Sequence, residues 1–286
     1  MNTFLAEFAS LMWGPWILFL LLGTGCWLTI CLRGIQVRQL FYSLRLTFSK
    51  ERGGEGDISH FGALSTALAA TVGTGNIAGV SAAVALGGPG AIFWMWVTGL
   101  VGMATKYCEG FLAVKYRQVN HRGEISGGPM YYLEKGLGQK WLGVCFAFFG
   151  AMAAFGIGNM VQANTTVHAL NGSLGVSSFF VGGVMMMLTG MVIIGGIKRI
   201  AEVASYLVPF MVLVYFLGAL IVVLNNLDGL GAGIKMILED AFTGTAATGG
   251  FAGASLASTI RYGVARGLFS NESGMGSAPI AAAAAK

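Results

Sequence analysis

A long charge-free stretch limits what this chain can fold into. No Asp, Glu, Lys or Arg occurs between Asp57 and Lys106, and 55% of all residues are hydrophobic while only 10% are charged. Soluble domains carry roughly 25% charged residues. About 20 consecutive apolar residues span a bilayer as a helix, and within the bilayer every main-chain amide and carbonyl must find a partner inside the protein. The chain is therefore expected to be an all-α polytopic membrane protein.

Six segments are long and apolar enough to cross a membrane, and a seventh is weaker because it is rich in glycine. In order, they are 12–32, 59–86, 89–114, 141–170, 177–197, 203–224 and 242–268. If each crosses once, all of the 17 Lys and Arg residues except Lys235 fall on one side, including Arg261, Arg266 and Lys286. Lys and Arg prefer the cytoplasmic side, so the N-terminus is expected outside. A short helix over 228–241 is expected on the outer surface.

The second segment has a polar, glycine-rich interruption at its centre, Thr71-Val72-Gly73-Thr74-Gly75-Asn76. An unpaired amide or carbonyl costs several kcal/mol in hydrocarbon, so a broken helix persists only where another group satisfies it. Freed carbonyls and the side-chain oxygens of Thr71, Thr74 and Asn76 could surround a cation. The amides that start the resumed helix suit a carboxylate. The break is therefore expected to bind a cation and a small solute.

Two other interpretations of this break were weighed. Residues 73–78 match the G-x-G-x-x-A pattern of dinucleotide sites, but such sites follow a strand and need an acidic residue about 20 positions later. Here a long apolar helix precedes the glycines, and residue 96 is Trp. A glycine seam that only packs helices together is the second alternative, and the sequence leaves it open.

A second glycine-rich interruption, 245–254, lies in the seventh segment, five helices after the first. Broken helices at corresponding positions of two repeats indicate the central site of a transporter, and this spacing fits a five-plus-five inverted repeat. In the fourth segment, Phe155, Asn159 and Gln162 share a helical face at spacings of four and three. Their amides are expected either to bind a ligand or to bond neighbouring helices.

Several classes of function are disfavoured. No spanning segment holds a central carboxylate, which argues against proton coupling. The three histidines and the Ser and Cys residues suggest no nucleophile–base set, which argues against an enzyme. The four cysteines form no CxxC pair and are expected to be small apolar residues, with no zinc site or disulfide. No cofactor and no nucleic-acid partner are expected.

Three motifs resemble the alanine or glycine:cation symporter family, whose members are sodium:alanine symporters. They are the stretches 69–79 (AATVGTGNIAG), 156–164 (GIGNMVQAN) and 261–279 (RYGVARGLFSNESGMGSAP). The resemblance runs along the whole chain. It implies a LeuT-type inverted-repeat fold with an extra N-terminal helix over 12–32, a first five-helix repeat over 59–225 and the start of a second repeat over 242–286.

The resemblance also implies the site. Sodium, the expected coupling ion, would be held mostly by main-chain carbonyls, at Ala69, Thr71, Val72 and Asn76. The expected substrate-binding residues are Thr74, Gly75, Phe155, Asn159, Gln162, Gly250 and Phe251.

The function implied is secondary active transport: sodium-coupled uptake of a small neutral amino acid, alanine or glycine, by alternating access. The location implied is the inner (plasma) membrane of a prokaryote. Family members continue with further helices after the run 281–285, so this chain is expected to be truncated at its C-terminus and inactive alone. A proton-coupled amino-acid carrier and a non-transporting membrane protein are the alternatives.

Overall fold

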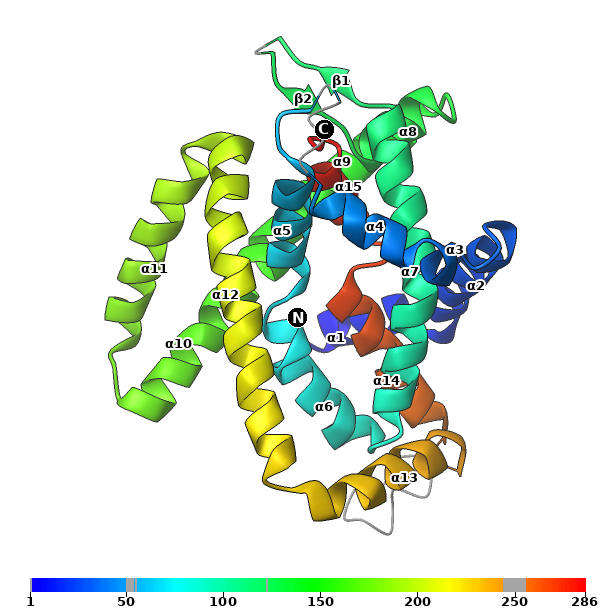
Figure 1. Cartoon of the computed structure of the whole chain (residues 1–286), viewed down its shortest axis with the longest axis vertical. Coiled ribbons are helices and arrows are strands. Elements are labelled where there is room, and N and C mark those ends of the chain that lie inside the picture. The colour runs from blue at the N-terminus through cyan, green and yellow to red at the C-terminus, as the bar shows by residue number, and fades with distance from the viewer. Residues whose placement is uncertain (1, 50–53, 55, 122, 244–255) are drawn as a thin grey trace. The chain divides into compact units, whose positions relative to one another are not determined.

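The computed structural model describes residues 2–49, 54, 56–121, 123–243 and 256–286, and helices predominate among them, as expected (Figure 1). The chain forms two compact units. Unit 1 comprises Met1–Phe41, Gly75–Tyr107 and Val214–Gly274. Unit 2 comprises Tyr42–Thr74, Cys108–Leu213 and Met275–Lys286.

The elements, in chain order, are α1 (Asn2–Met12), α2 (Pro15–Cys31), α3 (Ile35–Arg38), α4 (Leu40–Thr47), α5 (His60–Thr71), η1 (Thr74–Asn76), α6 (Ala78–Gly87), α7 (Ala91–Lys115), β1 (Gln118–Val119), β2 (Ile125–Ser126), α8 (Pro129–Lys135), α9 (Lys140–Phe155), η2 (Gly156–Met160), α10 (Val161–Leu174), α11 (Ser178–Ile193), α12 (Gly196–Leu224), α13 (Leu227–Thr243), α14 (Leu256–Asn271) and α15 (Ala278–Ala282). Local chemistry sets several of these boundaries. Pro15 occupies the first turn of α2, where its missing N–H costs nothing. The Ser59 side chain caps α5 by accepting a hydrogen bond from the amide of Gly62.

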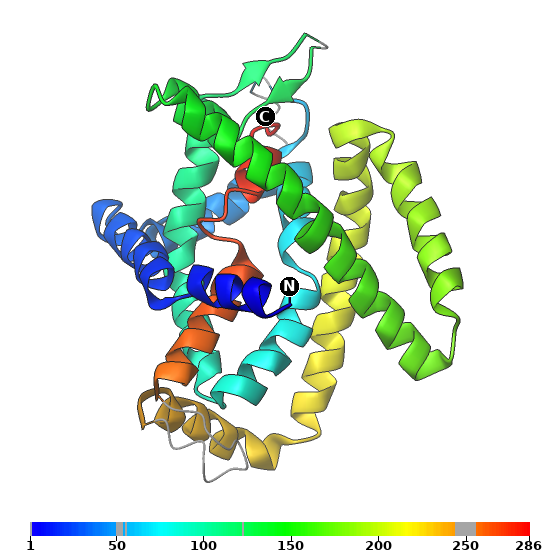
Figure 2. The same ribbon diagram turned by 180° about the vertical axis from the view of Figure 1, so that it is seen from behind.

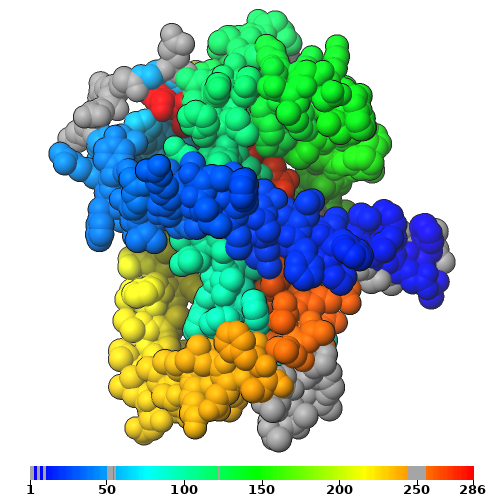
Figure 3. Space-filling model, turned by 90° about the vertical axis from the view of Figure 1, so that its right-hand side faces the viewer, coloured from blue at the N-terminus to red at the C-terminus, as the bar shows by residue number. Residues whose placement is uncertain are grey.

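In unit 1, α14 packs along α6 and also contacts α2 and α13. The Thr259 hydroxyl donates to the carbonyl of Gly87, the last residue of α6, at 2.6 Å. Leu18, Val264 and Leu268 form a buried apolar cluster between α2 and α14. Figure 3 shows α13, in yellow-orange, lying against α14, in orange. These contacts hold the second half of the broken helix beside a helix from the far end of the chain.

In unit 2, α5 packs against α15, and Ile58 pairs with Ala285 in an isolated parallel bridge. Ile58 also forms a buried apolar cluster with Ala201 and Ala284. The two short strands form an antiparallel hairpin in which Gln118 pairs with Ser126. Figure 2 shows α9, η2 and α10 as one continuous ribbon, in green. The first half of the broken helix is thus anchored by the last residues of the chain.

Two stretches of the described residues can cross a membrane by length and composition, Lys140–Leu174 and Gly196–Leu224. The bent pair His60–Thr71 and Thr74–Gly87 gives a third if it counts as one span, while α2 and α11 are apolar but shorter. Large apolar side chains cover the surface: Phe179 is 94% exposed and Trp16 is 83% exposed. Exposed apolar surface on this scale is typical of a protein that faces lipid.

The helices coincide closely with the expected segments from 12–32 to 203–224, and α13 occupies the expected surface helix at 228–241. The expected end of the seventh segment at residue 268 is wrong, because α14 continues to Asn271. Thr259 of α14 lies beside Gly87, at the end of the second segment, and the side of the membrane expected for Arg261 stays a prediction.

Candidate functional site

The expected interruption of the second segment is confirmed. Helix α5 ends at Thr71, and Val72 is extended, with φ −91° and ψ 94°. A single 3-10 turn, η1, follows, and α6 begins at Ala78. The chain therefore leaves the α-helical hydrogen-bond ladder over residues 72–77, where the sequence placed its glycines and polar side chains.

Within unit 2, the break meets Gln162 of α10. The Thr74 hydroxyl donates to Gln162 Oε1 at 2.9 Å, and the Thr74 amide lies 3.4 Å from the same oxygen. A Cβ at Gly73 would lie 3.2 Å from Gln162 Oε1, tighter than ordinary packing allows. Gly73 therefore lets the Gln162 side chain approach the main chain of the break. The structure brings Thr74 and Gln162 together, as the sequence analysis expected of residues in one site.

Phe155 and Asn159 lie elsewhere on the same helical stretch. The Phe155 side chain is 69% exposed, and Asn159 is also exposed. The segment between Phe155 and Gln162 is the π-helix η2, which has more residues per turn than an α-helix. This turn alters the regular spacing of four and three, and the expected shared site of Phe155, Asn159 and Gln162 stays a prediction.

Within unit 1, the break meets the end of α14. The Ser270 hydroxyl donates to Asn76 Oδ1. A Cβ at Gly75 would lie 3.4 Å from the Phe269 ring, which is ordinary contact distance. Sequence reasoning missed Phe269 and Ser270 because it ended the seventh segment before them. The signal that could have found them is the polar run 270–273, which continues directly from an apolar helical stretch.

A second interruption follows these residues. Between α14 and α15 the chain runs through turns, and Glu272, Gly274 and Gly276 have φ angles of +52°, +81° and +78°. A positive φ favours glycine and is strained for Glu272. Sequence reasoning placed the second break at 245–254 instead. That stretch, with Gly250 and Phe251, lies outside the residues that the structure describes.

The expected sodium ligands are neutral oxygens. The Thr71 hydroxyl donates back to the Ala67 carbonyl at 3.0 Å, so its proton already has a partner within α5. Ala69 is exposed, and Val72 and Asn76 are half-buried. Among the described residues no three His, Cys, Asp or Glu side chains gather into a metal-binding group. A hard cation bound at residues 69–76 would accordingly use main-chain and amide oxygens.

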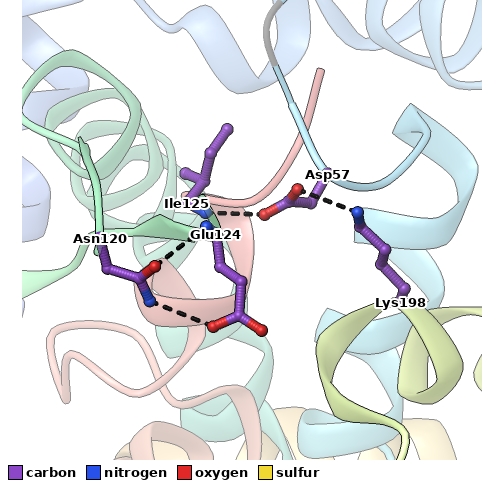
Figure 4. Close-up of polar contacts among 5 residues, drawn as sticks. All are labelled: Asp57, Asn120, Glu124, Ile125 and Lys198. Carbon is purple, nitrogen blue, oxygen red and sulfur yellow. Dashed lines mark hydrogen bonds and ion pairs between the residues drawn. The ribbon is translucent and has the colours of Figure 1, made fainter. Parts of the chain in front are cut away.

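Asp57 fixes the segment that leads into α5 (Figure 4). Its Oδ2 accepts a hydrogen bond from the Ile125 amide of β2 at 2.7 Å, and its Oδ1 lies 3.6 Å from Lys198 Nζ of α12. Asn120 and Glu124 close the turn of the same hairpin through a side-chain hydrogen bond of 3.1 Å. The Lys198 side chain is 71% exposed, so its ion pair with Asp57 is weakened by solvent. The hydrogen bond from the Ile125 amide therefore contributes more to holding Asp57 in place.

Tyr132 of α8 carries the one resolved pKa change among the described residues outside the spanning segments. Burial, with a smaller contribution from the Glu109 carboxylate, raises the pKa of Tyr132 to about 12. The phenol therefore remains protonated at neutral pH. Because the folded-state pKa is the higher one, the stability that the neutral phenol contributes is present below the unfolded pKa of 10.0 and is lost as the pH rises through 12.

Apolar helices covered by exposed hydrophobic side chains, with a break in mid-span, define a polytopic membrane protein of the transporter class. A model of the sodium:alanine symporter family matches residues 1–286, so the chain belongs to that family. The family is a family of transporters, in line with the expectation that the chain is not an enzyme, and its name implies sodium as the coupling ion.

Three relatives illustrate the similarity. The chain is 55% identical to the sodium/alanine symporter AgcS of Methanococcus maripaludis, over 97% of this chain and 62% of the relative. It is 50% identical to an uncharacterized transporter of Haemophilus influenzae, over 100% of this chain and 63% of the relative. It is 40% identical to the probable sodium/glutamine symporter GlnT of Bacillus subtilis, over 96% of this chain and 57% of the relative. The chain thus spans about three fifths of the length of these relatives, and the expected truncation stays a prediction.

Proposed function

We propose that the protein takes up alanine or glycine together with sodium, through a LeuT-type core. The observation that carries this proposal is the interrupted helix at 72–77. Its freed main-chain groups adjoin the neutral side-chain oxygens of Thr74 and Gln162 within unit 2, and that of Asn76 within unit 1. A guest that supplies a positive charge to carbonyls and a carboxylate to amides would satisfy both kinds of group. A zwitterionic amino acid with sodium has that chemistry.

The proposed roles are those that the resemblance to the family implies. The carbonyls of Ala69 and Val72 would face one sodium, and the Thr71 carbonyl with the Asn76 side chain would face a second position. The amides at Thr74 and Gly75 would bind the substrate carboxylate at the positive end of α6. The interrupted span at 72–77 supports an inverted-repeat core, because such folds place a broken helix in each repeat. The second interruption that the sequence predicts, at 245–254, lies outside the described residues.

The proposed setting is the inner membrane of a prokaryote, with the N-terminus outside. The orientation is supported by the basic residues concentrated in the segments 33–52, 115–140 and 198–199. The expected number of spans places all three segments on one side of the membrane. Alternating access around the break would then carry sodium and substrate inward. A membrane potential of 100 mV, negative inside, contributes about 2.3 kcal/mol per sodium, equivalent to roughly 50-fold accumulation.

Uptake into liposomes tests this proposal. We expect the full-length gene product to accumulate labelled alanine when sodium and an inside-negative potential are present, and to lose at least about 90% of that uptake when potassium or choline replaces sodium, since sodium supplies the driving force. Unlabelled glycine should compete more strongly than glutamine. Uptake that is indifferent to sodium would overturn the coupling.

Proton coupling is the second candidate, and a specific observation supports keeping it. Glu109 of α7 is only 9% exposed. It lies close to the end of the expected segment 89–114, where sequence reasoning counted no central carboxylate, and a buried carboxylate near a span could carry a proton. A relative from Bacillus subtilis, 42% identical, bears the name putative sodium/proton-dependent alanine carrier protein YrbD. A protonophore added to the same liposomes separates the two: it should leave sodium-driven uptake intact and abolish proton-driven uptake.

A further inference from the structure

Helix α7 carries two ionisable side chains far from its ends. At 1.5 Å per residue, Lys106 lies roughly 14 Å before Lys115, the last residue of the helix. Glu109 lies one turn after Lys106 and is buried. Sequence reasoning expects α7 to cross the membrane as the segment 89–114. An ionisable side chain inside a spanning helix is costly, so it needs a partner, and it usually has a function. Neither residue belongs to the break at 72–77.

In unit 1, Lys106 meets the end of α14. Its Nζ donates to the main-chain carbonyl of Asn271 at 3.0 Å, and Asn271 is the last residue of that helix. The last carbonyls of a helix have no partner within it, and they form the negative end of its dipole. The Lys106 ammonium therefore supplies a positive charge to the terminal carbonyl of α14, as a bound cation would.

Close packing brings the two helices to this distance. A Cβ at Gly102, one turn before Lys106, would lie only 2.6 Å from Ser273 Oγ and 3.3 Å from Asn271 Nδ2. A larger residue at this position would require the Ser273 side chain to move. The Lys106 contact therefore lies where α7 and the chain after α14 pack closely.

Holding Asn271 also holds the two residues before it. Ser270 donates to Asn76 Oδ1, and Phe269 lies beside Gly75, all within unit 1. The last turn of α14 is therefore fixed at one end by Lys106 and presents its side chains to the first break. A shift of this turn would move the Ser270 hydroxyl away from the Asn76 side chain.

Unit 2 shows the complementary arrangement. Glu109 Oε1 accepts a hydrogen bond from the Gly276 amide at 3.1 Å, just before α15 begins at Ala278. An ammonium on a terminal carbonyl and a carboxylate on an initial amide each match the polarity of the main chain that they meet. The polar main chain of the second break is in this way partnered by side chains of the protein itself.

We propose that Lys106 is a positioning residue for transport: a resident ammonium that fixes the end of α14 and so orients Asn76 through Ser270. The inference rests on the proposed function, because it assumes that Asn76 binds the coupling cation. It assigns to Lys106 an effect on sodium binding without contact between Lys106 and sodium.

Three variants of the full-length gene product test this role in the liposome uptake assay. We expect Lys106→Met to raise the half-saturating sodium concentration about 10-fold, because it removes a charged hydrogen bond, and Lys106→Arg to stay within about 3-fold of wild type. Lys115→Met is the matched control and should not change it, since Lys115 is exposed at the end of the same helix. The amount of folded protein is measured by size-exclusion chromatography for each variant.

The outcomes separate the possibilities. A purely structural Lys106 would lower the folded amount of Lys106→Met but leave the half-saturating sodium concentration of the folded fraction unchanged, which would overturn the proposal. If Lys106→Met does not accumulate, Lys106→Gln, which keeps an N–H donor without the charge, is measured instead, and an unchanged sodium response again overturns it. Absence of sodium-dependent uptake in the wild type would refute the proposed function, whatever the variants do.

Discussion

Replacing Asn76 with Leu is expected to reduce sodium-dependent alanine uptake by at least about 100-fold, the largest functional effect that the structure predicts for a single side chain. Leu is similar in size but has no amide oxygen. The substitution removes the proposed ligand oxygen and leaves the Ser270 hydroxyl without its acceptor. The Ser270 hydroxyl is half-buried, so losing its acceptor should cost less than the roughly 1–3 kcal/mol of a buried unsatisfied group, and the variant should fold with a slightly lower melting temperature.

Asn164→Leu is the matched control, because Asn164 of α10 is exposed and undergoes the same chemical change. It should keep wild-type uptake. Both variants are compared after their folded amounts are equalised, so that a defect in folding is not read as a defect in transport. If Asn76→Leu transports alanine as well as Asn164→Leu does, the break has only a packing role, and the non-transporting alternative gains support.

Substituting Gly263 with Ala is expected to lower the free energy of unfolding by about 2–4 kcal/mol, the largest effect on stability, because an added methyl group would overpack a tight helix contact. Gly263 lies on the face of α14 that meets the start of α7. A Cβ there would lie 2.6 Å from the main-chain oxygen of Ala91 and 2.7 Å from Trp94 Cβ. The main chain cannot move aside as a flexible side chain can, so the helices must separate.

Gly218→Ala provides the contrast. Gly218 lies inside α12, and nothing lies within 4 Å of a Cβ added there. Alanine has the higher helix propensity, by up to about 1 kcal/mol, so this variant should be neutral or slightly stabilised. Thermal unfolding in detergent measures both. Equal melting temperatures for the two variants would show that α14 does not pack against α7 as described.

Most of the helical segments could be predicted from the requirements of a lipid bilayer. Its thickness sets the length of each apolar segment, so the segments that became α2, α5 with α6, α7, α9 with α10, α11 and α12 could be recognised without any tertiary information. The first break could also be predicted, because Gly73 and Gly75 flank Thr74 within an otherwise apolar helix. These predictions depend on local composition alone.

The second break at 272–277 escaped prediction for a physical reason. Arg261 and Arg266 lie within α14, and charged residues of this kind usually mark the end of a span. The contact of Asn76 with Ser270 joins residues separated by 194 positions, and no local pattern indicates such a pairing. The π-helix at η2 changes the side-chain register by one residue, which regular helical spacing does not anticipate. The contact of Asn76 with Ser270 is a tertiary feature, and the cause of the π-helix does not follow from regular helical spacing.

Amide hydrogen exchange of the peptides that cover residues 71–77 tests the central claim most directly. If the exposed main-chain groups of the break are satisfied by a guest, sodium and alanine together should slow exchange there by at least about 10-fold, with a smaller effect of sodium alone, because bound ligand must leave before these amides open. The segment over 178–193, in α11, serves as the internal reference and should not change. Unchanged exchange at 71–77 under conditions where alanine is measurably bound would contradict the account.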